Sequence, residues 1–383
     1  MPTSPKILTV YYKHKPGGFC KRLRMQIEAY LEKGWHVHYV AVEPFPYSHP
    51  HLVPHLLPGS PRNHDSLPFW IYFFLVSPWY VLWVGLKEQV DFLSAVSPLY
   101  ALLSTPAKWF TRVPMQTLLL SKPRFNTDCR DTYRSLSHIE TWMEKRGLKF
   151  SDHLLANSQG SKTEWVKHYG KEFEKIKVLP NNVILSPFRK NEKREKLVRE
   201  FSLNPDAFVI ATASVLEPHK NLDFLLKTFA ELNHPKTILL IIGDGVQLPE
   251  LQRLAERLAV DGRTIFTGWR EDVLDLIQGS DLYVFPSLRE GMSESLLEAM
   301  TCGVPCLVSA IPENMEVARN PEQHFSPNHP GDLAKKIDRL IEDGKYRDSL
   351  LQTTREDIKR FVFDWEGKIQ KEAEDLLNRF DKK

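Results

Sequence analysis

Residues 281–305 read DLYVFPSLREGMSESLLEAMTCGVP and carry the densest structural signal in the chain. Its first residues, Asp281–Phe285, form a short apolar and aromatic run that is typical of a buried strand. A proline and a serine then turn the chain, and the pattern predicts a helix from about Ser293 to Met300. Val304–Ser309 has the composition of a further buried strand. Strand, helix and strand in this order predict one unit of a parallel sheet.

The same alternation of strands and helices extends on both sides of this unit, and it indicates parallel sheets. A dense charged stretch, residues 189–196, interrupts the pattern, which then restarts. We predict an α/β fold of two Rossmann-like doubly wound domains, 1–186 and 187–363, that face each other across a cleft. The predicted strands are Ile7–Tyr12, His36–Val42, Asp91–Val96, Met115–Leu120, His153–Ala156, Phe208–Ala213, Thr237–Ile242, Thr264–Thr267, Asp281–Phe285 and Val304–Ser309.

Length and cysteine content agree with two domains in a reducing compartment. The chain has 383 residues, which suits two domains of roughly 150–200 residues each. Its four cysteines are sparse, and no secretory signal precedes them, so we expect a cytoplasmic protein. Cys302 and Cys306 are four residues apart, but no other Cys or His pair completes a metal site, and we expect small buried thiols.

Charge is unevenly distributed along the chain. Residues 1–150 contain 18 Lys and Arg against 10 Asp and Glu, a net charge of +8, whereas the remainder carries −5. An electropositive first half predicts an anionic partner on that side: a membrane surface, a phosphorylated acceptor or nucleic acid. Chance asymmetry is the alternative explanation.

Residues 67–86 read LPFWIYFFLVSPWYVLWVGL, an uncharged stretch about as long as a bilayer span requires. Pro78 in its middle predicts two helical halves joined by a hinge. A single span here would also put the two flanks of one domain on opposite sides of a membrane. Because Trp and Tyr favour the membrane interface, we favour a helix that lies on the inner leaflet. A buried core helix and a true span are the alternatives.

The loop and helix within residues 281–305 also carry candidate chemistry. Glu290 is expected at the carboxyl end of the strand, and Gly291 would let a ligand approach the backbone. The amides and the positive dipole end at the helix start attract phosphate oxygens. Glu298, about one turn into the helix, can accept hydrogen bonds from a ribose diol. The alternative is that Glu290 is a turn residue and Glu298 belongs to a solvated helix face.

A second candidate element follows the strand at 208–213. Lys220 precedes a predicted helix, where a cation is disfavoured unless it meets an anion. A fixed cation there can neutralise a diphosphate leaving group, and an exposed lysine is the alternative. Gly17 and Gly18, after the first strand, would allow the backbone near a phosphate or a sugar, or would form a simple turn.

These residues resemble the retaining glycosyltransferases of family 4, which have the GT-B fold. The resemblance is strongest from about Val209 to Glu316 and includes LLIIGDG, IFTGWREDV, SDLYVFPSLREGMSESLLEAM and CGVP. It implies that residues 187–363 bind the nucleotide-sugar donor and that residues 1–186 bind the acceptor. Residues 363–366 resemble the start of the family's last helix, which implies that 364–383 packs back on the N-terminal domain.

The resemblance implies roles for individual residues. Glu290 and Lys220 would be catalytic: Glu290 would contact hydroxyls of the transferred sugar, and Lys220 would meet the diphosphate. Glu298 would hold the ribose, and Arg270 would lie near the base through its backbone. No metal and no cofactor are implied, and the sequence contains no Asp-x-Asp triplet. Backbone groups that bind the donor are implied at Gly291, Met292 and Ser293 for the sugar, at Glu294 and Ser295 for the phosphates, and at Gly17 and Gly18 from the other domain.

The chain departs from the family pattern at two positions that matter for the chemistry. Many relatives carry an arginine five residues before the lysine, where this chain has Val215. Neutralisation of the diphosphate would then rest on Lys220 and backbone dipoles, or on another arginine such as Arg22 or Arg289. A histidine often follows the strand that ends near Leu120, and this chain has none there. The acceptor side of the reaction is therefore the least defined.

We predict a retaining, metal-independent glycosyltransferase that moves a sugar from a UDP- or GDP-sugar to a glycan or lipid-linked acceptor, in bacterial surface polysaccharide or glycolipid synthesis. It would act in the cytoplasm, in peripheral contact with the inner face of the membrane, and without nucleic acid as a partner. The alternatives are a nucleotide-sugar epimerase of the same fold and a non-catalytic membrane-surface protein on a transferase scaffold. An NAD-dependent dehydrogenase is disfavoured because no G-x-G-x-x-G follows the first strand.

Overall fold

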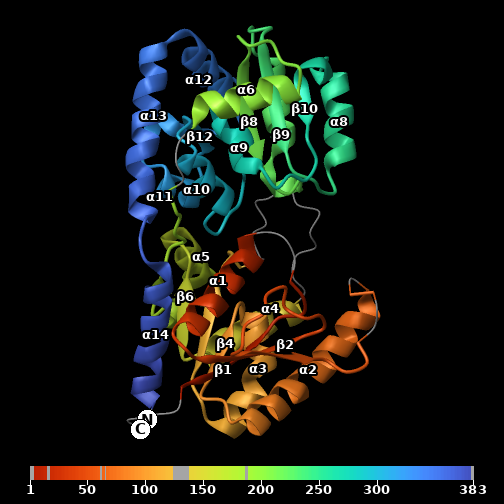
Figure 1. The fold of residues 1–383 in the computed structure, drawn as a ribbon, viewed down its shortest axis with the longest axis vertical. Coiled ribbons are helices and arrows are strands. Elements are labelled where there is room, and N and C mark those ends of the chain that lie inside the picture. The colour runs from red at the N-terminus through yellow and green to blue at the C-terminus, as the bar shows by residue number, and fades with distance from the viewer. Residues whose placement is uncertain are drawn as a thin grey trace. The chain divides into compact units, whose positions relative to one another are not determined.

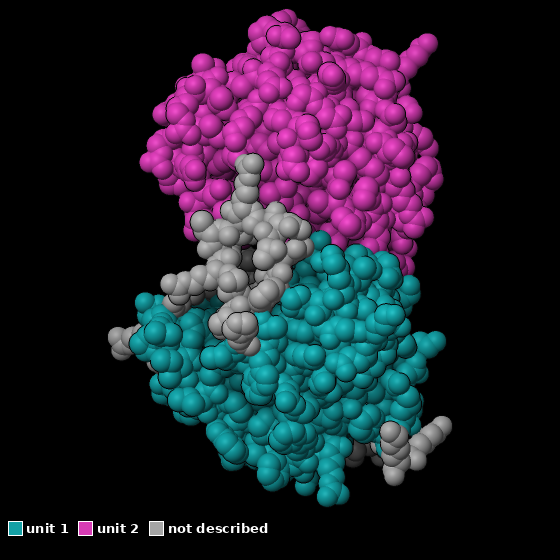
Figure 2. Space-filling model, turned by 180° about the vertical axis from the view of Figure 1, so that it is seen from behind, with its two compact units in different colours: residues 1–125, 135–180, 364–383 teal, residues 126–134, 181–363 magenta. Residues whose placement is uncertain are grey.

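The structure, a computed structural model, describes residues 4–14, 18–60, 63–64, 66–123, 138–185 and 189–380. The chain divides into two compact units (Figure 2). The first unit comprises residues 1–125, 135–180 and 364–383, so the C-terminal segment belongs with the N-terminal one. The described residues of the second unit lie within 181–363.

The first unit is built on a parallel sheet of seven strands in the order β3-β2-β1-β4-β5-β6-β7. The order reverses between β1 and β4, because β2 and β3 lie on one side of β1 and the later strands lie on the other. Doubly wound sheets of this kind bind ligands where the strand order reverses. The strands are β1 (Lys6–Val10), β2 (His36–Ala41), β3 (Leu52–Leu56), β4 (Phe92–Ala95), β5 (Met115–Leu119), β6 (His153–Ala156) and β7 (Lys177–Val178).

Helices of the first unit pack on this sheet. Helices α2, α3 and α4 pack one against the next, and the C-terminal helix α14 packs against α1 (Figure 1). Gln370 on α14 donates from Nε2 to the carbonyl oxygen of Ala29 at 2.5 Å. Glu372 on the same helix contacts His153 at 2.7 Å and Lys177 at 2.8 Å. The helices are α1 (Gly18–Glu32), α2 (Leu67–Glu88), α3 (Pro98–Thr111), α4 (His138–Phe150), α5 (Gln159–Tyr169), η1 (Lys171–Phe173) and α14 (Trp365–Phe380).

Helix α2 differs from the prediction. We predicted two halves hinged at Pro78, but Leu67–Glu88 forms one continuous helix with the proline inside it. The buried residues lie on the same face of the helix before and after the proline. Packing of this face therefore outweighs the backbone hydrogen bond that Pro78 cannot donate. The buried residues are Phe69, Phe73, Ser77, Val81, Val84 and Gly85.

The second unit repeats the plan with a parallel sheet of six strands in the order β10-β9-β8-β11-β12-β13. Its order reverses between β8 and β11. Val209 and Ala211 pack into one apolar cluster, whereas Ile210 between them packs into another, so both faces of the sheet are covered. The strands are β8 (Phe208–Ala213), β9 (Thr237–Ile242), β10 (Thr264–Phe266), β11 (Leu282–Phe285), β12 (Cys306–Ser309) and β13 (His324–Phe325).

Helices of the second unit connect these strands, and the last of them lead the chain back to the first unit. The helices are α6 (Lys190–Glu200), η2 (Pro218–Lys220), α7 (Leu222–Ala230), α8 (Leu248–Arg257), η3 (Asp261–Arg263), α9 (Val273–Gln278), α10 (Glu294–Thr301), α11 (Pro312–Val317), η4 (Pro321–Gln323), α12 (Pro330–Glu342), α13 (Gly344–Ile358) and η5 (Lys359–Phe361).

The chain passes into the second unit after Pro180, ahead of the boundary at 186 that the sequence predicts. The reason lies in the hydrogen bonds of the following residues. Asn181 donates from Nδ2 to the carbonyl oxygen of Met292 at 3.1 Å. The amide of Val183 donates to the carbonyl oxygen of Phe361 at 2.9 Å. These contacts attach the segment to the second unit before the charged stretch begins.

The predicted α/β fold class with two Rossmann-like sheets is confirmed. Each predicted strand is present, and its ends differ from the prediction by no more than two residues. The edge strands β3, β7 and β13 were not predicted. Two of them have only two residues, and β3 contains Pro54, which a sheet tolerates only at its edge.

Candidate functional site

The second sheet brings two loops together at the point where its strand order reverses. The neighbouring strands β8 and β11 run parallel, so their carboxyl ends lie at the same edge. The chain leaves β8 toward the short helix η2 and leaves β11 into the loop that precedes α10. The amide of Leu288 in the second loop donates to the carbonyl oxygen of His219 in the first at 2.8 Å. The two loops are therefore fixed relative to each other.

Lys220 and Glu290 form an ion pair at this point. Lys220 Nζ lies 2.7 Å from Glu290 Oε1 and 5.6 Å from the ring centroid of Phe285 at the end of β11. The two side chains are 15% and 10% exposed, so bulk water screens the pair only weakly. An ammonium group has three donors, so Lys220 can contact Glu290 and an anionic ligand together. Two residues that belong to separate sequence motifs thus lie side by side.

Helix α10 begins directly after this pair. Ser293 caps it: its Oγ accepts from the amide of Leu296 at 3.2 Å and lies 3.0 Å from Ser295 Oγ. Gly291 and Met292 lead from Glu290 into the cap, and Glu294 is the first helical residue. The predicted run from residue 290 to 295 is therefore a loop that ends in a helix N-terminus, where the helix dipole favours negative charge.

Glu298 lies on the first turns of α10, on the side that faces Tyr283 and Cys302. Burial raises the pKa of the Cys302 thiol to about 12, and the Glu298 carboxylate adds to this shift. Burial also raises the pKa of Tyr283, with a smaller contribution from Glu298. Cys302 and Cys306 are buried free thiols, as predicted.

Asn181 holds the Glu290 loop and was not predicted as a site residue. Its side chain donates to the carbonyl oxygen of Met292, and its own amide lies 3.2 Å from the Met292 sulfur. The buried Asn181 therefore fixes the loop two residues after Glu290. The pair Asn181-Asn182 just after β7 is the sequence signal that could have pointed to it.

Arg270 is engaged by two carboxylates. Its guanidinium contacts Glu200 at 2.6 Å and Asp272 at 2.8 Å. The hydrogen bond from Arg270 holds the pKa of Asp272 well below its usual range. With its side chain occupied in this way, Arg270 offers a ligand mainly its backbone. Val215, in the position where an arginine was expected, is an exposed valine.

Glycines let the loops after β8 and β9 approach closely. A Cβ at Gly243 would lie 1.9 Å from the carbonyl oxygen of Ser214, and φ at Gly243 is +130°. A Cβ at Gly245 would lie 2.6 Å from the backbone nitrogen of Leu216. Both positions exclude any side chain, so these glycines permit the close approach of the two loops.

The remaining predicted residues belong to the first unit. Gly18 is the first residue of α1 and follows β1 at the reversal point of its sheet, whereas Gly17 lies outside the described residues. The loop after β5 is anchored through its carbonyl groups. Leu120 accepts from Asn157 Nδ2 at 3.0 Å, and Ser121 accepts from Trp165 Nε1 at 2.9 Å.

These features define an α/β protein with two doubly wound sheets and, in the second, a carboxylate–ammonium pair beside a helix N-terminus. Such a site offers a cation and a positive helix end for phosphate, and carboxylates for sugar hydroxyls. The fold is that of the GT-B glycosyltransferases. Residues 193–357 match the family model described as glycosyl transferases group 1.

The chain is similar to the UDP-Gal:alpha-D-GlcNAc-diphosphoundecaprenol alpha-1,3-galactosyltransferase of Escherichia coli. The two are 28% identical over 243 residues, which cover 61% of each chain. The match therefore spans less than two thirds of that relative's own length.

Two solved structures share the fold over nearly their whole length. Sucrose-phosphate synthase from Thermosynechococcus elongatus superimposes with a TM-score of 0.81 at 19% identity, covering 99% of this chain and all of that one. Anabaena Alr3699/HepE in complex with UDP-glucose gives a TM-score of 0.77 at 20% identity, covering 98% and 99%. At this identity the likeness establishes the fold.

Proposed function

We propose that the protein is a glycosyltransferase that moves a sugar from a nucleotide-sugar donor to an acceptor held at a membrane. The observation that carries this proposal is the ion pair of Lys220 and Glu290 at the reversal point of the second sheet. It is supported by the match of residues 193–357 to the glycosyl transferases group 1 and by the donor named for the Escherichia coli relative.

The second unit would bind the donor. Lys220 and the N-terminus of α10 would meet the diphosphate, and Glu290 would accept hydrogen bonds from the sugar hydroxyls. Glu298, farther along α10, would hold the ribose. Gly291, Met292 and Ser293 would present their backbone to the sugar, and Glu294 and Ser295 would present theirs to the phosphates. We also propose that the backbone of Gly18 contacts the donor and that the backbone of Arg270 lies near the base.

The chemistry would be electrostatic and would retain the anomeric configuration. The bond between the anomeric carbon and the diphosphate breaks, and the acceptor oxygen bonds to that carbon on the same face. The departing diphosphate takes the acceptor's proton, and Lys220 stabilises its growing negative charge. Glu290, partly neutralised by Lys220, stays close to the positively charged sugar. Lys220 and the N-terminus of α10 would provide this stabilisation, so the proposed reaction needs no metal.

Helix α2 supports contact with a membrane. Its exposed apolar residues recur every three or four positions and form a stripe on one side of the helix. The opposite side packs into the unit, and a lipid-surrounded span would have to pull this side away. An interfacial position satisfies both sides. The stripe consists of Leu67, Ile71, Leu75, Trp79, Trp83 and Leu86, which are 49% to 72% exposed.

Basic side chains stand at the end of this stripe. The exposed Lys87 lies with Nζ 4.8 Å from the ring centroid of Trp83. Arg112 is exposed and follows Thr111, whose methyl carbon packs 3.5 Å from the Cβ position of Gly85. Each cation near an anionic membrane contributes about 1 kcal/mol of attraction. We therefore propose that α2 binds an anionic lipid surface, such as the inner leaflet.

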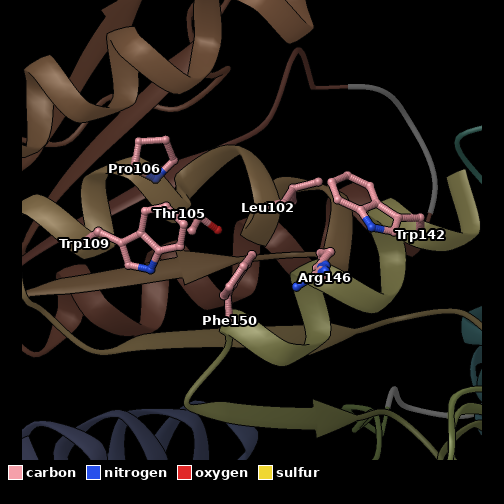
Figure 3. Close-up of a pocket in the computed structure, with 7 residues that line it drawn as sticks. All are labelled: Leu102, Thr105, Pro106, Trp109, Trp142, Arg146 and Phe150. Atoms are coloured by element: carbon pink, nitrogen blue, oxygen red, sulfur yellow. The ribbon is translucent and has the colours of Figure 1, made fainter. Parts of the chain in front are cut away.

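An apolar groove between α3 and α4 offers a place for the acceptor's lipid chain (Figure 3). It has a volume of about 330 Å³, and Trp109, Phe150 and Trp142 line it. Arg146 lies on the same wall, with its guanidinium 5.5 Å from the ring centroid of Trp142. Apolar walls with one cation suit the chain and the phosphate of a lipid-linked saccharide.

Ligand-induced stabilisation tests the donor proposal. The melting temperature of the protein is measured with UDP, GDP and ADP, and then with sugars of the nucleotide that binds. A nucleoside diphosphate that binds only the folded state raises the melting temperature. Release of that nucleotide in the presence of a lipid-linked saccharide then identifies transfer. A protein that none of these nucleotides stabilises would contradict the proposal.

A further inference from the structure

Two histidines and a glutamate meet at one edge of the first sheet. His38 lies on β2, His55 lies on the edge strand β3, and Glu88 is the last residue of α2. One ligating atom from each residue lies within 4.8 Å of the other two. His38 Nδ1 and His55 Nε2 are 2.9 Å apart, so the two ring nitrogens already face each other.

The register of the parallel strands produces this arrangement. His38 lies opposite Val53, and His55 lies opposite Val40, two residues farther along each strand. Side chains two residues apart point to the same face of a sheet, so both imidazoles share one face. Helix α2 ends there, because Gln89 adopts the left-handed conformation with φ 52° and stops the helix at Glu88.

We propose that His38, His55 and Glu88 bind one zinc ion, which fastens the edge strand β3 and the end of α2 to the sheet. Two imidazole nitrogens and a carboxylate oxygen are a donor set that suits zinc, and three protein ligands leave a fourth position for water. His38 is buried and Glu88 is partly exposed, so the ion would enter past the glutamate. This site is independent of the donor site in the second unit, for which no metal is expected.

Some charges around the cluster favour a bound cation and others disfavour it. Glu88 supplies a negative charge, and the carboxyl-terminal end of a 22-residue helix favours a cation. Two lysines oppose it. Lys6 Nζ donates to the carbonyl oxygen of Glu88 at 2.9 Å, and Lys87 Nζ lies 3.5 Å from Glu88 Oε1. Lys87 is 56% exposed and can turn into solvent when an ion takes its place.

A neighbouring histidine pair provides a matched control. His36 and His51 stack with ring centroids 4.3 Å apart, next to the cluster. Among the described residues, only His38, His55 and Glu88 form a group of three ligands at this spacing. His51 is not one of these three ligands, so the site should tolerate its loss.

The test uses the full-length protein, stripped of metal with a chelator and dialysed. Zinc binding is measured by titration calorimetry, and bound metal is counted by elemental analysis. We expect one zinc ion per chain and a higher melting temperature with zinc. His38→Ala and His55→Ala should lower the affinity by more than the roughly 10–100-fold that loss of an outer-shell partner causes. His51→Ala should bind zinc as the wild type does.

Glu88→Gln keeps the test decisive if a histidine variant does not fold, because Glu88 lies nearer the surface. Cobalt in place of zinc adds a spectroscopic readout, since its visible absorption reports the ligand set. Absence of zinc binding in the wild type would overturn the proposal. So would binding that survives the loss of His38, His55 and Glu88, or binding that His51→Ala abolishes equally.

Discussion

The two sheets share one strand order, and they differ in what stands at the reversal point. In the second unit, the loops after β8 and β11 present the paired charges Lys220 and Glu290. In the first unit, β1 is followed by the buried tyrosines Tyr11 and Tyr12. Tyr11 packs against Tyr100, with ring centroids 5.1 Å apart. One scaffold thus carries a charged loop pair in one copy and an aromatic cluster in the other, and the loops, rather than the sheet, set the chemistry.

The surfaces of the units differ in the same sense. The first unit exposes the apolar stripe of α2 and carries the groove between α3 and α4. The sequence of residues 1–150 is also basic, whereas the remainder is acidic. This difference agrees with the proposal that the second unit binds the polar, phosphate-bearing donor and the first unit binds an apolar, anionic acceptor.

Replacement of Glu290 by glutamine should have the largest effect. The amide keeps the shape of the side chain but removes the negative charge beside the sugar. Transfer should fall by a factor on the order of 10²–10³, while nucleotide binding persists through Lys220 and α10. Steady-state kinetics and calorimetry separate the two effects. Glu256→Gln, at an exposed position of α8, is the control. Turnover like that of the wild type would exclude Glu290 from the reaction.

Gly243→Ala should destabilise the second unit. The added Cβ would collide with the Ser214 carbonyl oxygen at 1.9 Å, and φ of +130° is unfavourable for an L-residue. Together these predict a loss on the order of 3 kcal/mol, seen as a lower melting temperature in calorimetry. Gly262→Ala is the control, because nothing lies within 4 Å of the Cβ that it would add. Equal melting temperatures for both variants would show that the loops after β8 and β9 do not depend on this close approach.

Lys220→Ala should weaken nucleoside diphosphate binding by about 10- to 100-fold, the loss of a charge-assisted hydrogen bond. It also leaves Glu290 unpaired next to the phosphates, which adds to the loss. Calorimetric titration with the diphosphate that stabilises the protein measures the effect. Lys227→Ala on α7 removes an exposed ion pair with Asp223 and should bind normally. If both variants bind alike, Lys220 does not meet the diphosphate.

Changes to the α2 stripe test the assignment of the first unit. Trp79→Ala and Trp83→Ala should each reduce binding to anionic vesicles by about 10-fold, through loss of apolar area at the interface. Co-sedimentation with vesicles of phosphatidylglycerol, against phosphatidylcholine, measures it. Trp269→Ala removes an exposed tryptophan of the second unit and should bind vesicles unchanged. A wild type that binds neither kind of vesicle would contradict the membrane proposal.

Sequence patterns predicted the strands other than the edge strands β3, β7 and β13, because burial periodicity is local. They also placed Glu290 and Lys220 at strand ends, since each follows a recognisable strand. That the two side chains meet depends on β8 and β11 being neighbours, which strand order decides. The cluster of His38, His55 and Glu88 was not predicted for the same reason, because it joins two strands and a helix end. Such contacts depend on register, and no single segment encodes them.

The smallest expected effect concerns the packing of α14 within the first unit. Burial lowers the pKa of His153, although its partner Glu372 opposes the shift. Below the ordinary histidine pKa of about 6.5, the unfolded chain binds a proton that the folded one resists. Stability should therefore fall as the pH drops from about 6.5 through the lowered pKa, and stay level above it. His153→Gln removes this titrating group, so the variant should not lose stability in this way. The difference in unfolding free energy between wild type and variant should therefore shrink at acidic pH. A difference that does not change between pH 8 and pH 5 would show that His153 keeps its ordinary pKa in the folded unit.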